Sequence, residues 1–340
     1  MALRPAGHRT ALKRVADTIR AARRVASVCH ENPDADTLGA AIAIALIARR
    51  LGKEYEIVCA DQPAPMYSFL PLFDQIISQP TGLADVAVVC DAATLERIGP
   101  IASSCAAWLS KTEVVNIDHH ATNLGFGTAN LVDPAAAATC EIVAELLPVL
   151  HIEPDAELAT ALLSGIVRDT NGFADAATSP RTLRQAASLL EAGAPLAAIY
   201  RTILEEMPYE RMLLWGRLLH DLGQRHCGRV VFACLTQRML EETNTEQPDA
   251  DGVAEFIAQA KGADITLLLR ELDAGGTRVS IRTSGSVSAA EIARPFAGGG
   301  HVRRAGCTIP AGLHDAVAQI LAICDAQLPT GGVPGNASAA

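Results

Sequence analysis

Aspartate and histidine side chains recur where apolar segments of this sequence end. One such segment ends at His30, and Asp34 and Asp36 follow it closely; another ends at Asp91. Carboxylate oxygens and imidazole nitrogens form the donor set of a binuclear metal site, in which one carboxylate bridges two cations about 3.5–4 Å apart. The candidate residues are His30, Asp34, Asp36, Asp91, Asp118, His119, His120 and Asp169.

Each candidate taken alone has an ordinary structural explanation. Asp34 or Asp36 alone is better explained as the N-cap of a helix that begins at Thr37. Asp91 alone fits a turn after a strand, a lone pair of histidines fits the surface or the core, and Asp169 alone fits a loop equally well. The metal interpretation therefore depends on all of these residues lying at the ends of four separate elements.

The apolar segments predict the sheet that would bring these residues together. They are short and nearly uninterrupted, as in parallel strands buried on both faces. Strands are predicted at 24–30, 54–60, 85–91 and 113–118, and helices at 37–51, 139–147, 156–168 and 180–192. This alternation predicts an α/β fold with a mostly parallel, doubly wound sheet. Such sheets bind ligands at the carboxyl ends of their strands, where the candidates fall.

The pattern changes after residue 192, and 340 residues suit two domains. We expect a catalytic metal-binding domain at 1–192, a helical linker at 193–220, a smaller α/β substrate-binding domain at 221–328 and a disordered tail at 329–340. The second domain is predicted to contain a strand at 230–235, a helix at 250–261, a hairpin of 264–272 and 278–283, and a closing helix at 314–327.

Composition narrows the classes of partner. The net charge is −10, which disfavours a protein that binds long nucleic acids through a basic face, but a short nucleotide held by a few arginines fits. The nine cysteines form no CxxC pair, which argues against a zinc ribbon and suits a reducing cytoplasm. The longest uncharged apolar stretch, 38–48, is too short to span a bilayer, so we expect a cytoplasmic protein without membrane contact.

One segment of this acidic chain is basic. Residues 277–306 contain five arginines and a single acidic residue, Glu291. The glycines at 298–300 would let backbone N–H groups approach a phosphate, and His301 and Arg282 could bind it directly. A flexible turn and a solvated face are the competing explanations.

Taken together, these residues resemble the ordered motifs of the DHH phosphoesterase superfamily. The first four are His30-x-x-x-Asp34-x-Asp36, Asp91, Asp118-His119-His120 and Gly165-x-x-x-Asp169-Thr170. The fifth, Gly298-Gly299-Gly300-His301-x-x-x-Ala305-Gly306, resembles the GGGH motif of the DHH-associated C-terminal domain. The length, without extra modules, most resembles the nano-RNase/PAP phosphatase subgroup, which cleaves short oligoribonucleotides, linear dinucleotides such as pApA, and 3′-phosphoadenosine 5′-phosphate (PAP).

The resemblance implies a role for each residue. His30, Asp34 and Asp91 would hold one divalent cation, and Asp36, His119 and Asp169 a second, with Asp91 bridging. Asp118 would orient the histidines, and His120 would assist the transferring phosphate during in-line attack by hydroxide; which of the two histidines binds metal is left open. The cations implied are Mn²⁺, with Mg²⁺ or Co²⁺ as substitutes. The substrate contacts implied are Arg282, Gly298, Gly299, Gly300, His301 and Arg304.

Two departures from the family pattern bear on the substrate. The motif that often continues as DTGxFR has Ala174 at the usual arginine position, and Arg304 stands where alanine is common, which would favour a substrate with an extra terminal phosphate. The alternatives are a phosphodiesterase for cyclic dinucleotides or pGpG, a manganese pyrophosphatase (which lacks the GGGH motif), a single-strand exonuclease (which carries further domains) and, from another class, a catalytically inactive nucleotide sensor. A homodimer is an open alternative to a monomer.

Overall fold

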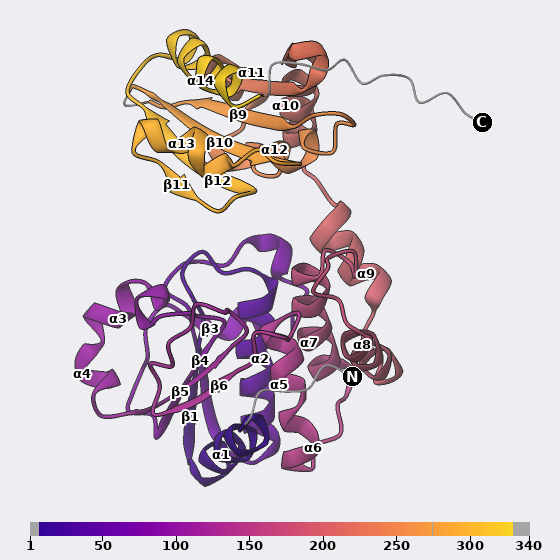
Figure 1. Ribbon diagram of the computed structural model, residues 1–340. Helices are drawn as coiled ribbons and strands as arrows, with labels where there is room; N and C mark the ends of the chain where they lie inside the picture. Colours follow the sequence, from indigo (N-terminus) through magenta and orange to yellow (C-terminus); the bar gives the residue numbers. More distant parts are fainter. Residues whose placement is uncertain (1–6, 274, 329–340) are drawn as a thin grey trace. The chain divides into compact units, whose positions relative to one another are not determined.

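The computed structural model describes residues 7–273 and 275–328, so the expected disordered tail at 329–340 lies outside the described residues. The chain divides into two compact units, Met1–Glu206 and Met207–Ala340 (Figure 1). The segment 193–220, expected as a helical linker, is shared between them: α9 (Leu196–Tyr200) packs on the first unit, and α10 (Tyr209–His220) packs in the second. No helix within the described ranges is long and apolar enough to cross a bilayer.

The first unit contains a six-stranded sheet in which every strand is parallel, in the order β3-β2-β1-β4-β5-β6. This confirms the predicted α/β class. The order reverses between β1 and β4, and the crevice outside the carboxyl ends of the strands at such a reversal is a usual ligand site. The strands are β1 (Arg24–Val28), β2 (Glu54–Val58), β3 (Ile76–Ile77), β4 (Val86–Cys90), β5 (Glu113–Asp118) and β6 (Ala129–Val132).

Helices cover both faces of this sheet (Figure 1). One face is covered by α1 (His8–Ala21), α2 (Ala35–Arg50), α5 (Thr139–Ala144), α6 (Leu146–Leu150) and α7 (Ala156–Asp169), with α8 (Pro180–Glu191) packed on α7. The other face is covered by η3 (Leu95–Ile98), α3 (Pro100–Ser104) and α4 (Ala106–Leu109). The helix predicted at 139–147 is two helices, because Pro148 has no N–H to donate to the carbonyl of Ala144, where α5 ends.

Glycine allows α2 and α7 to pack closely. A β-carbon at Gly39 would lie 2.3 Å from the carbonyl oxygen of Ala161, which no side chain could tolerate without a shift of one helix. Fourteen of the sixteen residues of α2 are buried, so this helix is enclosed on all sides. The close approach brings Asp36, in the first turn of α2, towards Asp169 at the last residue of α7.

The second unit contains a mixed sheet in the order β11-β12-β10-β9-β8-β7, in which β8 and β9 pair in parallel and the other described neighbours pair antiparallel. The predicted hairpin is confirmed as β9 and β10. The strands of the whole sheet are β7 (Gly223–Arg225), β8 (Val230–Leu235), β9 (Ile265–Glu271), β10 (Thr277–Thr283), β11 (Gly299–Gly300) and β12 (Arg304–Ile309).

Helices cover this second sheet as well. α13 (Ala289–Ala293) and α14 (Leu313–Gln327) pack on one face; α10, α11 (Gln237–Thr243) and α12 (Val253–Ile257) pack on the other. The helix predicted at 250–261 was too long, because Gly252, in a left-handed conformation, precedes α12 and the helix ends at Ile257. Single helical turns lie at Pro65–Tyr67 (η1), Phe73–Gln75 (η2), Arg201–Glu205 (η4, a π-helix), His226–Gly228 (η5), Gln247–Ala250 (η6) and Arg294–Phe296 (η7).

Candidate metal centre

The predicted ligands of the first unit lie together at the carboxyl edge of the sheet. They fall into three groups of possible ligands, and the ligand atoms within each group lie within 4.8 Å of one another. Asp91 and His119 each belong to two groups, so the groups form one continuous cluster. The groups are His30, Asp34 and Asp91; Asp36, His119 and Asp169; and Asp91, His119 and His120.

His30 lies two residues beyond β1, and its ring orientation is fixed by the backbone. Its Nδ1 donates to the carbonyl of Glu31 over 2.7 Å. Because a carbonyl only accepts, Nδ1 holds a proton and Nε2 is the atom available to a cation. Nε2 lies 3.4 Å from Asp91 Oδ2 and 3.9 Å from Asp34 Oδ1. Burial lowers the pKa of His30, but the hydrogen bonds with Asp91 and Glu31 outweigh it and raise the pKa.

Asp34 and Asp36 begin α2 and are held differently. Asp34 is the N-cap, since its Oδ1 accepts the N–H groups of Asp36 and Thr37 at 3.0 and 3.3 Å; the N-cap explanation is therefore correct for Asp34, which also lies in a ligand group. Asp36 is fully buried, and its two oxygens accept the N–H groups of Thr139 and Cys140 at 2.6 and 2.9 Å. Burial and the charges of Asp169 and Asp91 raise the pKa of Asp36 well above its usual range.

Asp91 lies at the centre of the cluster, directly after β4. Its backbone has a φ of 60°, a left-handed conformation that is uncommon for aspartate and often marks a functional site. Its Oδ1 lies 3.5 Å from His119 Nε2 and accepts the hydroxyl of Thr139 over 3.0 Å. Burial alone would raise the pKa of Asp91, but the hydrogen bond with His30 and the charge of His119 hold it below its usual value.

The run 118–120 divides its side chains between the interior and the surface. Asp118 is fully buried, and its Oδ1 accepts the N–H of His119 and Nδ1 of His120 at 2.8 and 2.7 Å, while Oδ2 accepts the amide of Asn123 at 2.6 Å. His119 points its Nε2 at Asp169 Oδ2, 3.2 Å away. The His120 side chain is 47% exposed, and its bond with Asp118 raises its pKa.

The charge of the cluster fits divalent cations. Burial, followed by the charges of Asp91 and Asp34, raises the pKa of Asp169 to about 8. Four carboxylates held this close repel one another when ionised, and two divalent cations would remove that repulsion. The donors of the three groups are carboxylate oxygens and imidazole nitrogens, a set that suits Mn²⁺ or Mg²⁺ better than a soft metal.

Sequence reasoning did not identify three residues of this cluster. Thr139 and Cys140 hold Asp36 through backbone N–H groups, which residue type does not encode. Asn123 joins Asp118 to Asn116 through bonds of 2.6 and 2.7 Å, and its position three residues after His120 was the available signal.

The basic residues predicted to bind substrate lie in the second unit. Arg282 on β10 is directly opposite Arg304 on β12, so the two side chains emerge on the same face of the sheet. Arg282 is not free, because its Nε and Nη2 donate to Glu255 Oε1 on α12 at 3.1 and 2.5 Å. Burial raises the pKa of Glu255, but Arg282 and Arg304 outweigh it and lower the pKa.

The GGGH motif is a paired strand instead of an open loop. Gly299 and Gly300 form β11 and pair with Gly306 and Ala305 of β12. A β-carbon at Gly298 would lie 2.4 Å from Cys307 Cβ, and one at Gly300 would lie 2.4 Å from the Arg304 carbonyl oxygen, so both glycines permit this tight hairpin. His301, the next residue, is exposed.

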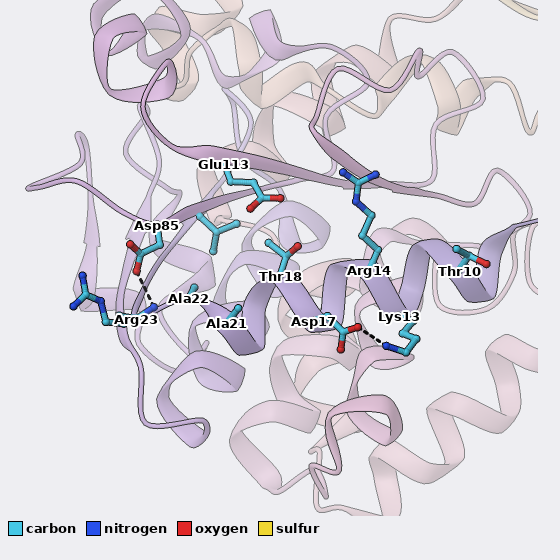
Figure 2. Close-up of a pocket in the computed structure, with 11 residues that line it drawn as sticks. Thr10, Lys13, Arg14, Asp17, Thr18, Ala21, Ala22, Arg23, Asp85 and Glu113 are labelled. Atoms are coloured by element: carbon cyan, nitrogen blue, oxygen red, sulfur yellow. Dashed lines mark hydrogen bonds and ion pairs between the residues drawn. The ribbon is translucent and has the colours of Figure 1, made fainter.

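A cavity of about 760 Å³ lies at the opposite, amino edge of the first sheet (Figure 2). It is lined by α1 and by residues at the starts of β4 and β5, such as Asp85 and Glu113. Lys13 pairs with Asp17 at 2.5 Å, and Asp85 accepts the N–H of Arg23 at 2.7 Å. Because the ligand cluster lies at the other edge of the sheet, the cavity is not part of the metal centre.

Comparison with known proteins decides the family. The DHH family N-terminal domain matches residues 24–166, and the DHHA1 domain matches residues 228–328. The bifunctional oligoribonuclease and PAP phosphatase of Thermus thermophilus is 36% identical over 284 residues, which cover 82% of each chain. This chain belongs to the DHH family. The resemblance predicted from the motifs is thereby confirmed, and DHH phosphoesterases are metal-dependent hydrolases of phosphoric esters.

Two further relatives of this DHH protein agree in sequence or in fold. The bifunctional oligoribonuclease and PAP phosphatase of Bacillus subtilis is 26% identical over 288 residues, covering 82% of this chain and 87% of the relative. The crystal structure of an exopolyphosphatase-related protein from Bacteroides fragilis has a TM-score of 0.83 at 20% identity, covering 96% and 98% of the two chains. At that identity the second likeness shows the shared fold alone.

Proposed function

We propose that this chain hydrolyses short oligoribonucleotides or linear dinucleotides, such as pApA and pGpG, together with PAP. The observation that supports this most strongly is the cluster of four carboxylates and three imidazoles at one edge of the first sheet. The named activity of the relative at 36% identity supplies the substrate class. The net charge of −10 favours a short substrate over long nucleic acid.

The cluster would hold two divalent cations, most simply Mn²⁺, with Mg²⁺ or Co²⁺ as substitutes. His30, Asp34 and Asp91 would hold one, and Asp36, His119 and Asp169 the other, with Asp91 shared. When bound, such cations supply an activated water and neutralise negative charge on the phosphoryl oxygens. Buried Asp118 would keep both histidines oriented, as outer carboxylates commonly do.

His120 is suited to donate a proton to the leaving oxygen. Its Nδ1 is bonded to Asp118 Oδ1, while the ring is half exposed towards a substrate. The same bond raises the pKa of His120. The imidazolium form, which carries a second proton on Nε2, therefore persists to a higher pH than in a free histidine. The distances favour His119 as the metal ligand and His120 as the residue that acts on the phosphate.

The second unit would bind the remaining phosphates of the nucleotide. Arg282 and Arg304 are like charges placed opposite each other, an arrangement that an anion stabilises. In the isolated unit Glu255 supplies part of that negative charge. We propose that phosphate contacts Arg282, Arg304 and His301, and that glycines 298–300 allow close approach.

Two aspects of the cellular setting remain proposals. All nine cysteines are free thiols, which supports a reducing compartment such as the cytoplasm. We propose that the partner is the nucleotide itself, with neither a membrane nor a long duplex involved; a homodimer remains to be tested by sedimentation.

The decisive experiment is hydrolysis by purified protein with Mn²⁺, comparing pApA, pGpG, PAP, cyclic di-AMP and pyrophosphate. Turnover of pApA, pGpG or PAP that a chelator abolishes is the expected result. Arg282→Ala should raise KM more than it lowers kcat, since it acts on binding. Turnover of cyclic di-AMP or pyrophosphate alone would replace the proposed substrate class, and metal binding without turnover would indicate a sensor.

A further inference from the structure

The C-terminal end of α7 places a cation beside the metal centre. Arg168 immediately precedes Asp169, and its side chain is 47% exposed. Its Nε lies 4.0 Å from Asp34 Oδ2, which is too long for a hydrogen bond. Arg168 makes no closer ion pair with any described residue, so its guanidinium group keeps its donors available to a ligand.

The charge balance of the site calls for such a group. Two divalent cations would balance the charges of Asp34, Asp36, Asp91 and Asp169 when these are ionised, and an incoming phosphate would then add negative charge. Within the described part of the chain, Arg168 alone among lysines and arginines lies within 4.0 Å of one of these four carboxylates. It is therefore placed to neutralise negative charge that the incoming phosphate adds.

Two structural explanations account for less of what is observed. A cation in the last turn of a helix interacts favourably with the helix dipole, but this does not require a position beside Asp34. An ion pair with Asp34 would explain that position, but a half-exposed pair at 4.0 Å contributes little. Tyr67 in η1 borders the same spot: its burial raises the pKa of its hydroxyl, and the nearby charges of Arg168 and Asp34 lower and raise that pKa respectively.

We propose that Arg168 binds a non-bridging oxygen of the substrate's reacting phosphate, beside the ligand group of His30, Asp34 and Asp91. This inference rests on the proposed function. A guanidinium group donates two parallel hydrogen bonds to phosphate, and such bonds strengthen as charge develops on the oxygens. Arg168 would thus act both on binding and on the rate of the chemical step.

The test compares Arg168→Ala and Arg168→Lys with Arg49→Ala. Arg49, on α2, is a matched control because its side chain is similarly exposed, at 39%. It pairs with Glu157 in the first turn of α7, the helix that carries Arg168 at its other end. Three quantities are measured: the affinity of metal-stripped protein for Mn²⁺, the affinity of Mn²⁺-loaded protein for inorganic phosphate, and kcat and KM for pApA. Calorimetry gives the first two without any reference to turnover.

Arg168→Ala should weaken phosphate binding about 10- to 100-fold, the range for a charge-assisted hydrogen bond, while Mn²⁺ affinity changes by less than about threefold. Arg168→Lys should recover part of the loss, since it restores the charge but not the fork. With pApA as substrate, Arg168→Ala should have a lower kcat and a higher KM. Arg49→Ala should match the wild type in all three measured quantities.

Unchanged phosphate affinity in Arg168→Ala would overturn the proposal. So would a loss of Mn²⁺ affinity alone, because that pattern would mean that Arg168 merely orients Asp34. If the wild type is inactive on every nucleotide but binds phosphate through Arg168, the proposed substrate class fails while the role of Arg168 stands. The two hypotheses can therefore fail separately.

Discussion

Gly165 on α7 lies so close to Asp36 on α2 that a β-carbon at position 165 would be 2.4 Å from Asp36 Oδ1. The same β-carbon would be 2.4 Å from Cys140 Sγ. Asp36 cannot move aside easily, because both of its oxygens accept backbone N–H groups from Thr139 and Cys140. Gly165 therefore determines how near the two helices bring their carboxylates.

Gly165→Ala should accordingly damage the metal centre. We expect the added methyl group to displace Asp36, to weaken Mn²⁺ affinity at least about tenfold and to lower the free energy of unfolding by about 1–3 kcal/mol. Calorimetric Mn²⁺ titration and urea unfolding measure the two effects. Gly216→Ala in α10 is the control: apart from the adjacent backbone of its own helix, nothing lies within 4 Å of the added β-carbon, so the change should be neutral or stabilise by up to about 1 kcal/mol. Wild-type Mn²⁺ affinity in Gly165→Ala would contradict the packing described above.

The strand-end residues of this site could be predicted because the geometry of a parallel sheet determines where they meet. His30 and Asp91 follow strands that are adjacent in the sheet, so their meeting needed no knowledge of tertiary contacts beyond strand order. The support for Asp36 could not be predicted, since its two oxygens are held by the backbone N–H groups of Thr139 and Cys140, which residue type does not encode. The pairing of Arg282 with Glu255 depends on how α12 lies on the second sheet, which no local pattern encodes.

The fold was predictable to a similar degree. Long apolar strands and helices were found, but β6 is a four-residue edge strand, too short for a clear pattern. α1 was also missed because only four of its fourteen residues are buried, among charged neighbours. The short strand β11 could not be predicted, since a pair of glycines has no strand preference and pairs only because β12 lies beside it.

Asp91→Asn should separate catalysis from folding. The change removes the charge shared by two ligand groups, so kcat should fall more than about 1000-fold, or about 4 kcal/mol. Asparagine tolerates a φ of 60°, so the melting temperature should change little, whereas Asp91→Ala should cost stability as well. Initial rates with pApA and thermal unfolding provide the measurements, with the exposed Asp74→Asn as control. Near-normal turnover in Asp91→Asn would rule out a shared ligand at this position.

In the metal-free protein, the free energy of unfolding should fall as pH rises. The pKa of Asp169 is about 8 in the folded protein and about 3.9 in an unfolded chain, so between these values the folded state binds more protons. The slope of the unfolding free energy with pH is proportional to the number of protons bound by the unfolded state minus the number bound by the folded state. This difference is negative here, so the free energy of unfolding decreases as pH rises across this window. Thermal unfolding in chelator should give a lower melting temperature at pH 8 than at pH 6.

Asp169→Asn is the control for that pH dependence. It removes the titrating group, so the decline between pH 6 and pH 8 should become smaller in chelator. In the wild type, Mn²⁺ binding at pH 7 should release protons, because the cation displaces the proton on Asp169. Calorimetry in two buffers of different ionisation enthalpy counts them, and identical heats in both buffers would contradict a protonated Asp169.

Arg181→Ala should weaken the segment that supports Asp36. Arg181 on α8 donates to fully buried Glu141, whose other oxygen accepts the N–H of Ala137 and the hydroxyl of Thr182, both at 3.0 Å. Loss of the cation leaves a buried carboxylate uncompensated, which should lower the free energy of unfolding by about 3–5 kcal/mol.

Glu141 lies one residue after Cys140, so the Arg181 variant should also bind Mn²⁺ more weakly at temperatures where it is still folded. Arg184→Ala, an exposed arginine on the same helix, should change stability by less than about 0.5 kcal/mol and leave Mn²⁺ affinity unchanged. A destabilised Arg181→Ala that binds Mn²⁺ as tightly as the wild type would show that the Glu141 contacts support the fold without positioning Asp36. Weakened binding in the folded variant would instead tie α8 to the metal centre through the N–H groups of Thr139 and Cys140.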